Sequence, residues 1–116
     1  MPTPFAERVL DLVAQIPPGQ ALAYGDVAAL LAGGGPRQVG RALALWGGGV
    51  PWWRVVRADG SPAPGYEAEA LRRLLAEGTP LRAGGGRVDL PAARWSGPVG
   101  GPWWDHPEGS DEPEGG

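Results

Sequence analysis

The stretch that decides the fold reads Val50-Pro51-Trp52-Trp53-Arg54-Val55-Val56-Arg57. Its proline fixes the incoming backbone, and two adjacent tryptophans precede a β-branched pair that arginines flank. This composition is typical of neither an ordinary strand nor a helix interior, so it predicts a rigid loop or tight turn that carries a function. The alternative is that Trp52 and Trp53 are core side chains, because tryptophan is usually well buried.

The length of 116 residues predicts one domain with a small core. The chain has no apolar run of about 18 residues and no basic start followed by an apolar stretch, so we expect neither a membrane span nor a secretory signal. We expect a soluble, cytoplasmic protein associated with the nucleoid. With no cysteine, there is no disulfide, thiolate nucleophile or cysteine metal site. The single histidine is His106, so no metal or cofactor is expected.

The charge is unevenly distributed along the chain. Of 13 acidic residues, 5 follow Gly97, which leaves 8 acidic against 10 basic residues in 1–96, a net charge of +2 despite −3 overall. Every basic residue is arginine, which suits bidentate phosphate contacts and stacking on bases. The alternative explanation for the absence of lysine is GC-rich coding, which would also account for the many glycines and prolines.

The first half of the chain predicts three helices. Thr3-Pro4 supplies an N-cap and a first helical proline, and apolar residues then follow at helical spacing up to Ile16. A second helix is expected over 26–31, ended by the glycines at 33–35. A third begins at Pro36, with Val39, Ala42 and Leu43 forming its buried stripe.

The second and third helices, joined by a glycine turn, predict a helix-turn-helix. Arg37 and Arg41 share the face of the third helix opposite its buried stripe; they form either a solvated charged face or a DNA contact. Residues 80–82 and 87–89 could pair around Gly84–Gly86 as a small wing. The expected fold is therefore mainly α with a small β wing, a winged helix-turn-helix-like single domain.

The C-terminal half predicts a fourth helix and a tail. The helix spans 67–77, with Leu71, Leu74 and Leu75 pointing inward and Gly78 as its cap. We assign the domain to residues 1–96. Residues 97–116 are rich in Gly, Pro and acids and are expected to form a disordered acidic tail, in which Trp103-Trp104 is either a docking element or a chance pair.

Several segments, in order and at nearly the right spacing, resemble the DNA-binding and active-site domain of the O6-alkylguanine-DNA alkyltransferases. They are Ile16–Gly19, Ala23–Ala28, Arg37–Ala42, Pro51–Val56 and Leu74–Gly78. Those enzymes carry Pro-Cys-His-Arg-Val where this chain has Pro51-Trp52-Trp53-Arg54-Val55. A tryptophan in the cysteine position is the mark of the alkyltransferase-like proteins, which bind alkylated guanine without repairing it. The resemblance covers roughly residues 5–95.

The resemblance implies roles for individual residues. Arg37 matches the arginine finger that fills the hole left by an extruded nucleotide, and Tyr24 matches the residue that helps rotate the 3′ phosphate. Trp52 takes the place of the acceptor cysteine and Trp53 that of its activating histidine. The full set expected to bind DNA or the lesion is Tyr24, Arg37, Gln38, Gly40, Arg41, Trp52, Trp53, Arg54 and Tyr66.

Two further positions depart from the family pattern or lose their partner. Trp46-Gly47-Gly48-Gly49 replaces the Asn-Pro hinge before the active-site loop, so either the glycines supply the turn or the loop is held less firmly. Glu77 matches the glutamate of the enzymes' proton relay, and without cysteine and histidine we expect it to be structural.

The function implied is non-enzymatic recognition of duplex DNA that carries O6-alkylguanine. The lesion would flip into a Trp-lined pocket, and the bound protein, a monomer, would flag it for nucleotide excision repair proteins. One alternative is a winged-helix transcription regulator that reads sequence through Gln38 and Arg41. Another is a decayed enzyme without a ligand.

Overall fold

Helix α1, Pro4–Val13, begins where the sequence predicts it. The computed structural model describes residues 1–98, and in it the Thr3 hydroxyl accepts a hydrogen bond of 3.0 Å from the Ala6 amide. This bond satisfies one of the free amides at the helix start. The helix ends three residues before the predicted Ile16, which is nevertheless buried after the turn.

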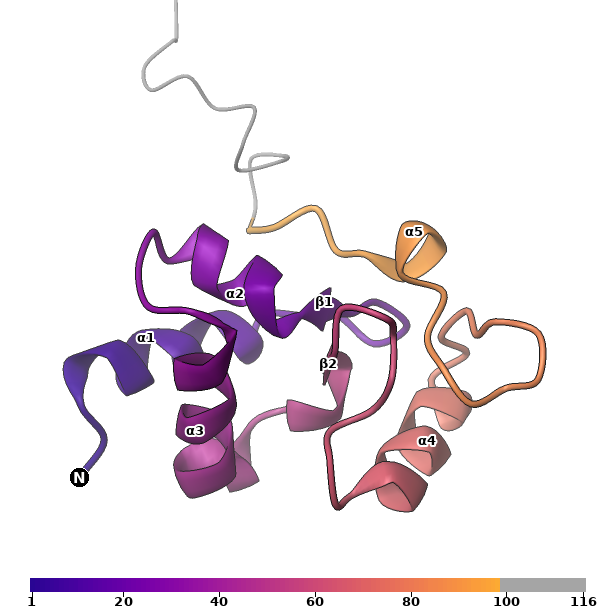
Figure 1. The fold of residues 1–116 in the computed structure, drawn as a ribbon, viewed down its shortest axis with the longest axis horizontal. Helices are drawn as coiled ribbons and strands as arrows, with labels where there is room; N and C mark the ends of the chain where they lie inside the picture. Colours follow the sequence, from indigo (N-terminus) through magenta and orange to yellow (C-terminus); the bar gives the residue numbers. More distant parts are fainter. Residues whose placement is uncertain (99–116) are drawn as a thin grey trace, which may run out of the picture.

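Helices α2, Tyr24–Leu30, and α3, Pro36–Trp46, form the expected helix-turn-helix and pack on α1 (Figure 1). Helix α2 starts at Tyr24, two residues before the predicted start. The Asp26 carboxylate accepts a hydrogen bond of 2.8 Å from the Ala23 amide and so caps the helix from its third position. On α3 the predicted stripe of Val39, Ala42 and Leu43 is buried, and this packing fixes which face of α3 points outward.

The two-stranded sheet lies elsewhere than predicted. Strand β1, Leu22–Ala23, pairs in parallel with β2, Val55–Val56, with Leu22 opposite Val55. The expected wing is reduced to one antiparallel bridge between Leu81 and Val88. The mainly helical fold with a small sheet is confirmed, but the sheet serves to tie the segment after Trp53 to the start of α2.

The remaining elements complete the second half of the domain. Short 3-10 helices η1, Gly47–Gly49, and η2, Trp52–Arg54, follow α3, and α4, Glu67–Ala76, and α5, Leu90–Ala93, come later. Helix α4 ends at Ala76 with Glu77 as its C-cap, and the next residue, Gly78, has a φ of +73°, which suits glycine. Leu74 is buried as predicted, whereas Leu75 is 63% exposed, so the prediction that it points inward is wrong.

Two apolar clusters hold these elements together. One joins α1, α2 and α3 and includes the buried Trp95; the other joins β1, β2, α4 and α5. Val55 belongs to the first cluster and its neighbour Val56 to the second, since successive strand side chains point to opposite faces. Strand β2 therefore lies between the two halves of the core.

Two expectations concern the ends and the membrane. The predicted tail and its Trp103-Trp104 pair lie, from residue 99 onward, outside the described residues, and the boundary at 96 stays a prediction. Within residues 1–98, the helices are all too short or too polar to cross a membrane.

We predict that Gly60→Ala destabilises the fold strongly. Gly60 has a φ of +89°, and a Cβ there would lie 2.2 Å from the Val88 carbonyl oxygen. The strain of a left-handed backbone and the clash should together lower the free energy of unfolding by about 3 kcal/mol. Urea denaturation measures this loss.

Gly65→Ala is the matched control for this prediction. Gly65 has a similar φ of +85°, but a Cβ there would meet no atom within 4 Å. Its cost should be the backbone strain alone, about 1 kcal/mol. Equal losses at both positions would show that the contact with Val88 is not the cause.

Candidate nucleic-acid interface

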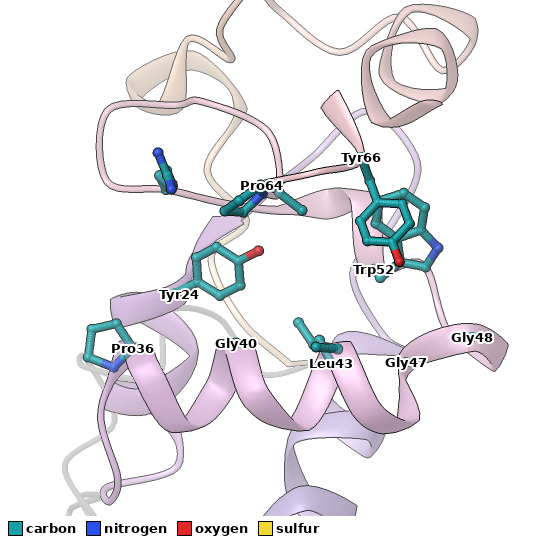
Figure 2. A pocket seen from close by; sticks show the side chains of 12 residues that line it. Tyr24, Pro36, Gly40, Leu43, Gly47, Gly48, Trp52, Pro64 and Tyr66 are labelled. Atoms are coloured by element: carbon teal, nitrogen blue, oxygen red, sulfur yellow. The ribbon is translucent and has the colours of Figure 1, made fainter. Parts of the chain in front are cut away.

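A cavity of about 500 Å³ opens between α3 and the segment 63–66 (Figure 2). Helix α3 supplies one wall, Gly47 and Gly48 after it line the end next to Trp52, and the proline-rich segment supplies the opposite wall. The lining residues are Tyr24, Pro36, Gly40, Leu43, Ala44, Gly47, Gly48, Trp52, Arg57, Ala63, Pro64 and Tyr66. The volume is within the range of small-molecule sites and accommodates a purine base.

Aromatic rings occupy one end of the cavity. The rings of Trp52 and Tyr66 lie 5.7 Å apart with an interplanar angle of 63°, an edge-to-face geometry that aromatic pairs favour. Tyr66 is 64% exposed, so it stands at the rim rather than in the core. Together the rings offer an apolar surface on which a flat heterocycle can stack.

Tyr24 and Pro36 lie at the other end of the cavity (Figure 2). Burial raises the pKa of the Tyr24 phenol, and the positive charge of Arg57 offsets this only in part. Tyr24 therefore keeps its proton at neutral pH. Its hydroxyl, which points into the cavity, can donate a hydrogen bond to a bound ligand.

Gly47 lies close to neighbouring side chains where α3 leads into the turn that lines the cavity. A Cβ on Gly47 would lie 3.3 Å from a Leu43 methyl and 3.7 Å from the Trp52 Cβ. A side chain at position 47 would thus be tight against Leu43 and in ordinary contact with Trp52. The segment after α3 forms the turn η1, whose Gly47 carbonyl accepts a hydrogen bond from the Val50 amide at 3.1 Å, and how firmly this loop is held stays a prediction.

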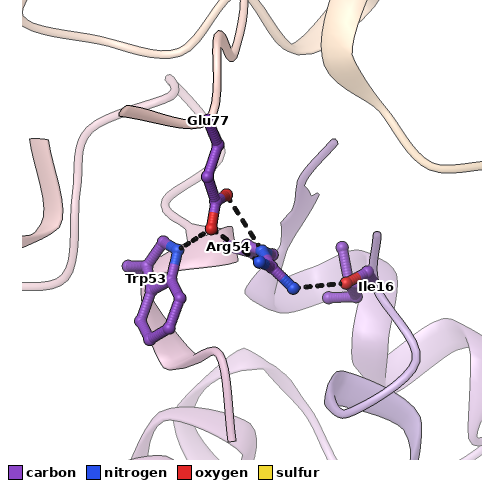
Figure 3. Close-up of polar contacts among 4 residues, drawn as sticks. All are labelled: Ile16, Trp53, Arg54 and Glu77. Carbon is purple, nitrogen blue, oxygen red and sulfur yellow. Dashed lines mark hydrogen bonds and ion pairs between the residues drawn. The ribbon is translucent and has the colours of Figure 1, made fainter. Parts of the chain in front are cut away.

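Trp53 and Arg54 point to a polar cluster centred on Glu77 (Figure 3). The Trp53 indole donates to Glu77 Oε2 at 2.9 Å, and Arg54 Nε donates to Glu77 Oε1 at 3.0 Å. Arg54 also donates to the Ile16 carbonyl at 2.7 Å. The cluster connects η2 to the end of α4 and to the turn after α1.

The cluster also favours the ionised form of the Glu77 carboxyl. Burial acts to raise the pKa of this carboxyl, but the hydrogen bonds from Arg54 and Trp53 and the charge of Arg54 outweigh it, so the net pKa is lowered. Only 12% of the Arg54 side chain and 14% of the Glu77 side chain are exposed. Glu77 therefore has the structural role expected for it.

The predicted site residues fall into three groups. Tyr24, Gly40, Trp52 and Tyr66 are brought together as lining of the cavity. Arg37, Gln38 and Arg41 are exposed on α3 outside it. Trp53 and Arg54 do not line it, because the Glu77 cluster engages them on the other side.

Sequence reasoning missed Arg57 as a lining residue. The sequence feature that could have indicated it is that Arg57 directly follows the apolar pair Val55–Val56. An arginine at the end of a buried strand is expected to reach the surface. The described residues hold no group of three His, Cys, Asp or Glu side chains that could bind a metal ion.

Comparisons with known proteins place this geometry in a family. Residues 4–79 match the family described as 6-O-methylguanine DNA methyltransferase, DNA binding domain. The chain is 41% identical over 99 residues to the DNA base-flipping protein of Escherichia coli. This match covers 79% of this chain and 74% of that protein. It is 43% identical over 77 residues to a methylated-DNA–protein-cysteine methyltransferase of Methanothermobacter thermautotrophicus, covering 63% of this chain and 43% of that enzyme.

Solved structures agree with this placement. S. pombe Atl1 in complex with damaged DNA containing O6-carboxymethylguanine superposes with a TM-score of 0.68 at 30% identity, covering 78% of this chain and 94% of that chain. A second complex of the S. pombe protein with DNA gives a TM-score of 0.64 at 31% identity. The chain belongs to the family of the 6-O-methylguanine DNA methyltransferase DNA-binding domain. Within that family it is an alkyltransferase-like protein.

We predict that Glu77→Gln lowers the free energy of unfolding by about 2 kcal/mol at pH 7, because Arg54 loses a nearly buried counter-charge. A carboxyl with a lowered pKa stabilises the fold above its ordinary pKa of 4.5 and ceases to do so as pH falls through the lowered value. The difference between the variant and the wild type should therefore shrink below pH 4.5. Urea denaturation at several pH values measures it, and a difference independent of pH would contradict the ion-pair account.

Proposed function

We propose that the protein is a non-enzymatic sensor of alkylated DNA. It binds duplex DNA that carries O6-alkylguanine, accepts the flipped base in the cavity beside Trp52, and releases it unchanged. The observation that carries the proposal is the Trp52 indole at the cavity wall, 5.7 Å from Tyr66. In the enzymes that this chain resembles, the acceptor cysteine occupies that position.

The chemistry of the chain supports binding without alkyl transfer. The sequence contains no cysteine, so no thiolate can accept an alkyl group. An indole instead offers a broad apolar face, and stacking of a base on an aromatic ring contributes roughly 1 to 3 kcal/mol. Unpairing costs least for a damaged guanine, which is one source of selectivity for the lesion.

The outer face of α3 is the proposed contact with the duplex. Arg37 and Arg41 are both exposed on α3, and Gly40 of the same helix lines the cavity. Arg37 is proposed as the finger that replaces the extruded nucleotide, with Gln38 and Arg41 contacting the groove and backbone. Helix α3 has small residues at Gly40 and Ala44, which allow the duplex to approach closely.

The relatives add support for this function. The Escherichia coli protein is a DNA base-flipping protein, and S. pombe Atl1 forms a complex with DNA containing O6-carboxymethylguanine. We further propose that the protein acts as a cytoplasmic, nucleoid-associated monomer and that the bound complex flags the lesion for nucleotide excision repair. The support for that last step is the family resemblance.

We predict that Trp52→Ala weakens binding to an O6-methylguanine duplex about tenfold or more, because the stacking surface is lost. Binding to the unmodified duplex should change little. Fluorescence anisotropy titrations of both duplexes measure the two affinities.

Trp52→Phe is the matched control, since it keeps an aromatic face and should retain most of the preference for the lesion. Equal losses on both duplexes with Trp52→Ala would discard the stacking role.

We predict that Arg37→Ala weakens lesion binding strongly while the melting temperature stays near that of the wild type, because Arg37 is exposed. Arg41→Ala should weaken binding to both duplexes alike, as expected of a backbone contact. Binding titrations and thermal denaturation together make this test. A large fall in melting temperature would instead make Arg37 a structural residue, and a strong preference for one undamaged sequence would favour a transcription regulator.

A further inference from the structure

A second hollow of about 320 Å³ adjoins the cavity at the end that Tyr24 forms. Tyr24, Pro36 and Arg57 line both spaces, so they lie at the boundary between them. Neither Trp52 nor Tyr66 lines the second hollow. The two spaces are therefore neighbours: Trp52 and Tyr66 line only the first, and Asp26 and Arg94 line only the second.

Arg57 is the cation at this boundary whose charge is not compensated by a close partner. Arg94, the other arginine that lines the hollow, forms an ion pair of 3.0 Å with Asp26. Within residues 1–98, Arg57 has no carboxylate within 4.0 Å; its charge acts on Asp59 and Glu67 at longer range. An exposed guanidinium in a hollow favours an oxyanion, and phosphate matches its planar fork.

We propose that the second hollow is a phosphate subsite, in which Arg57 binds a phosphate that flanks the extruded nucleotide. This inference rests on the proposed function, which brings a flipped base to the Trp52 end. A nucleotide joins a flat base to an anionic phosphate through the sugar. With its base beside Trp52 and Tyr66, its phosphodiester lies toward Tyr24 and Arg57.

Such a contact forms only after the nucleotide has left the base stack. It would then stabilise the flipped state and not the first encounter with intact duplex, so it would add to selectivity for a base that flips easily. This distinguishes Arg57 from the arginines on the outer face of α3, which meet the backbone of any duplex.

The test combines Arg57→Ala with a change in the DNA. Binding of the full chain is titrated on an O6-methylguanine duplex and its unmodified twin over a range of salt concentrations, and on lesion duplexes with a neutral methylphosphonate at the phosphate 5′ or 3′ to the lesion. We expect Arg57→Ala to weaken lesion binding about tenfold and the unmodified duplex less than about twofold. The salt slope on lesion DNA should fall by about one.

The methylphosphonate identifies the contacted group. At one of the two positions it should weaken binding of the lesion duplex by the wild type about tenfold and leave binding by Arg57→Ala unchanged. Arg72→Ala, which removes a 68% exposed arginine on α4, is the control for net charge and should behave as the wild type.

Three other results would overturn the inference. Equal losses on both duplexes would make Arg57 a general backbone contact. A lesion-selective loss without coupling to either methylphosphonate would place Arg57 on the base instead of the phosphate. If the wild-type protein does not bind the lesion duplex more tightly than the unmodified duplex, both the subsite and the proposed function are wrong. If it does, but the methylphosphonate weakens the wild type and Arg57→Ala equally, only the subsite is wrong.

Discussion

The contact between Arg54 and Glu77 holds the segment on which the rest of the structure depends. Through it, and through the pairing of Val55–Val56 with Leu22–Ala23, the chain after Pro51 is tied to α4, to the turn after α1 and to the start of α2. Both partners are nearly buried, and a buried pair of this kind stabilises a geometry because either charge alone would be costly. The segment is therefore fixed from both sides before any ligand arrives.

Because this segment is held in place, the two adjacent tryptophans point in different directions. Their rings lie 5.7 Å apart at an angle of 88°, one facing the cavity and the other facing Glu77 and the Arg73 guanidinium, 4.4 Å from its ring. By the resemblance drawn from the sequence, Trp52 and Trp53 take the places of the acceptor cysteine and its activating histidine. Trp53 is held by its hydrogen bond to Glu77, whereas Trp52 lines the cavity and, under the proposed function, stacks on the flipped base.

The sequence predicted the parts that depend on local signals. Thr3 and Pro36 mark the starts of α1 and α3, and Gly78 marks the end of α4, because caps act on their own neighbours. The pairing of Val55 with Leu22 was missed because the two residues are distant in sequence. The wing was overestimated from two short runs on either side of a glycine triplet.

The same division holds for the candidate site. The family pattern indicated Tyr24, Gly40, Trp52 and Tyr66, which the fold brings to one cavity. It could not show that Trp53 and Arg54 turn away toward Glu77, because that depends on where α4 ends in space. Nor could it show that Arg57 faces the cavity, since its direction follows from the missed strand.

The most direct test of the central claim, a reversible grip on an alkylated base, is one equilibrium titration followed by analysis of the DNA. The full chain is titrated with an O6-methylguanine duplex and with the same duplex unmodified. The bound DNA is then released and its mass is measured by mass spectrometry. The account predicts about tenfold or tighter binding of the lesion duplex and recovery of its methyl group intact on the guanine. Equal affinities, or recovered DNA that has lost the methyl group, would contradict it.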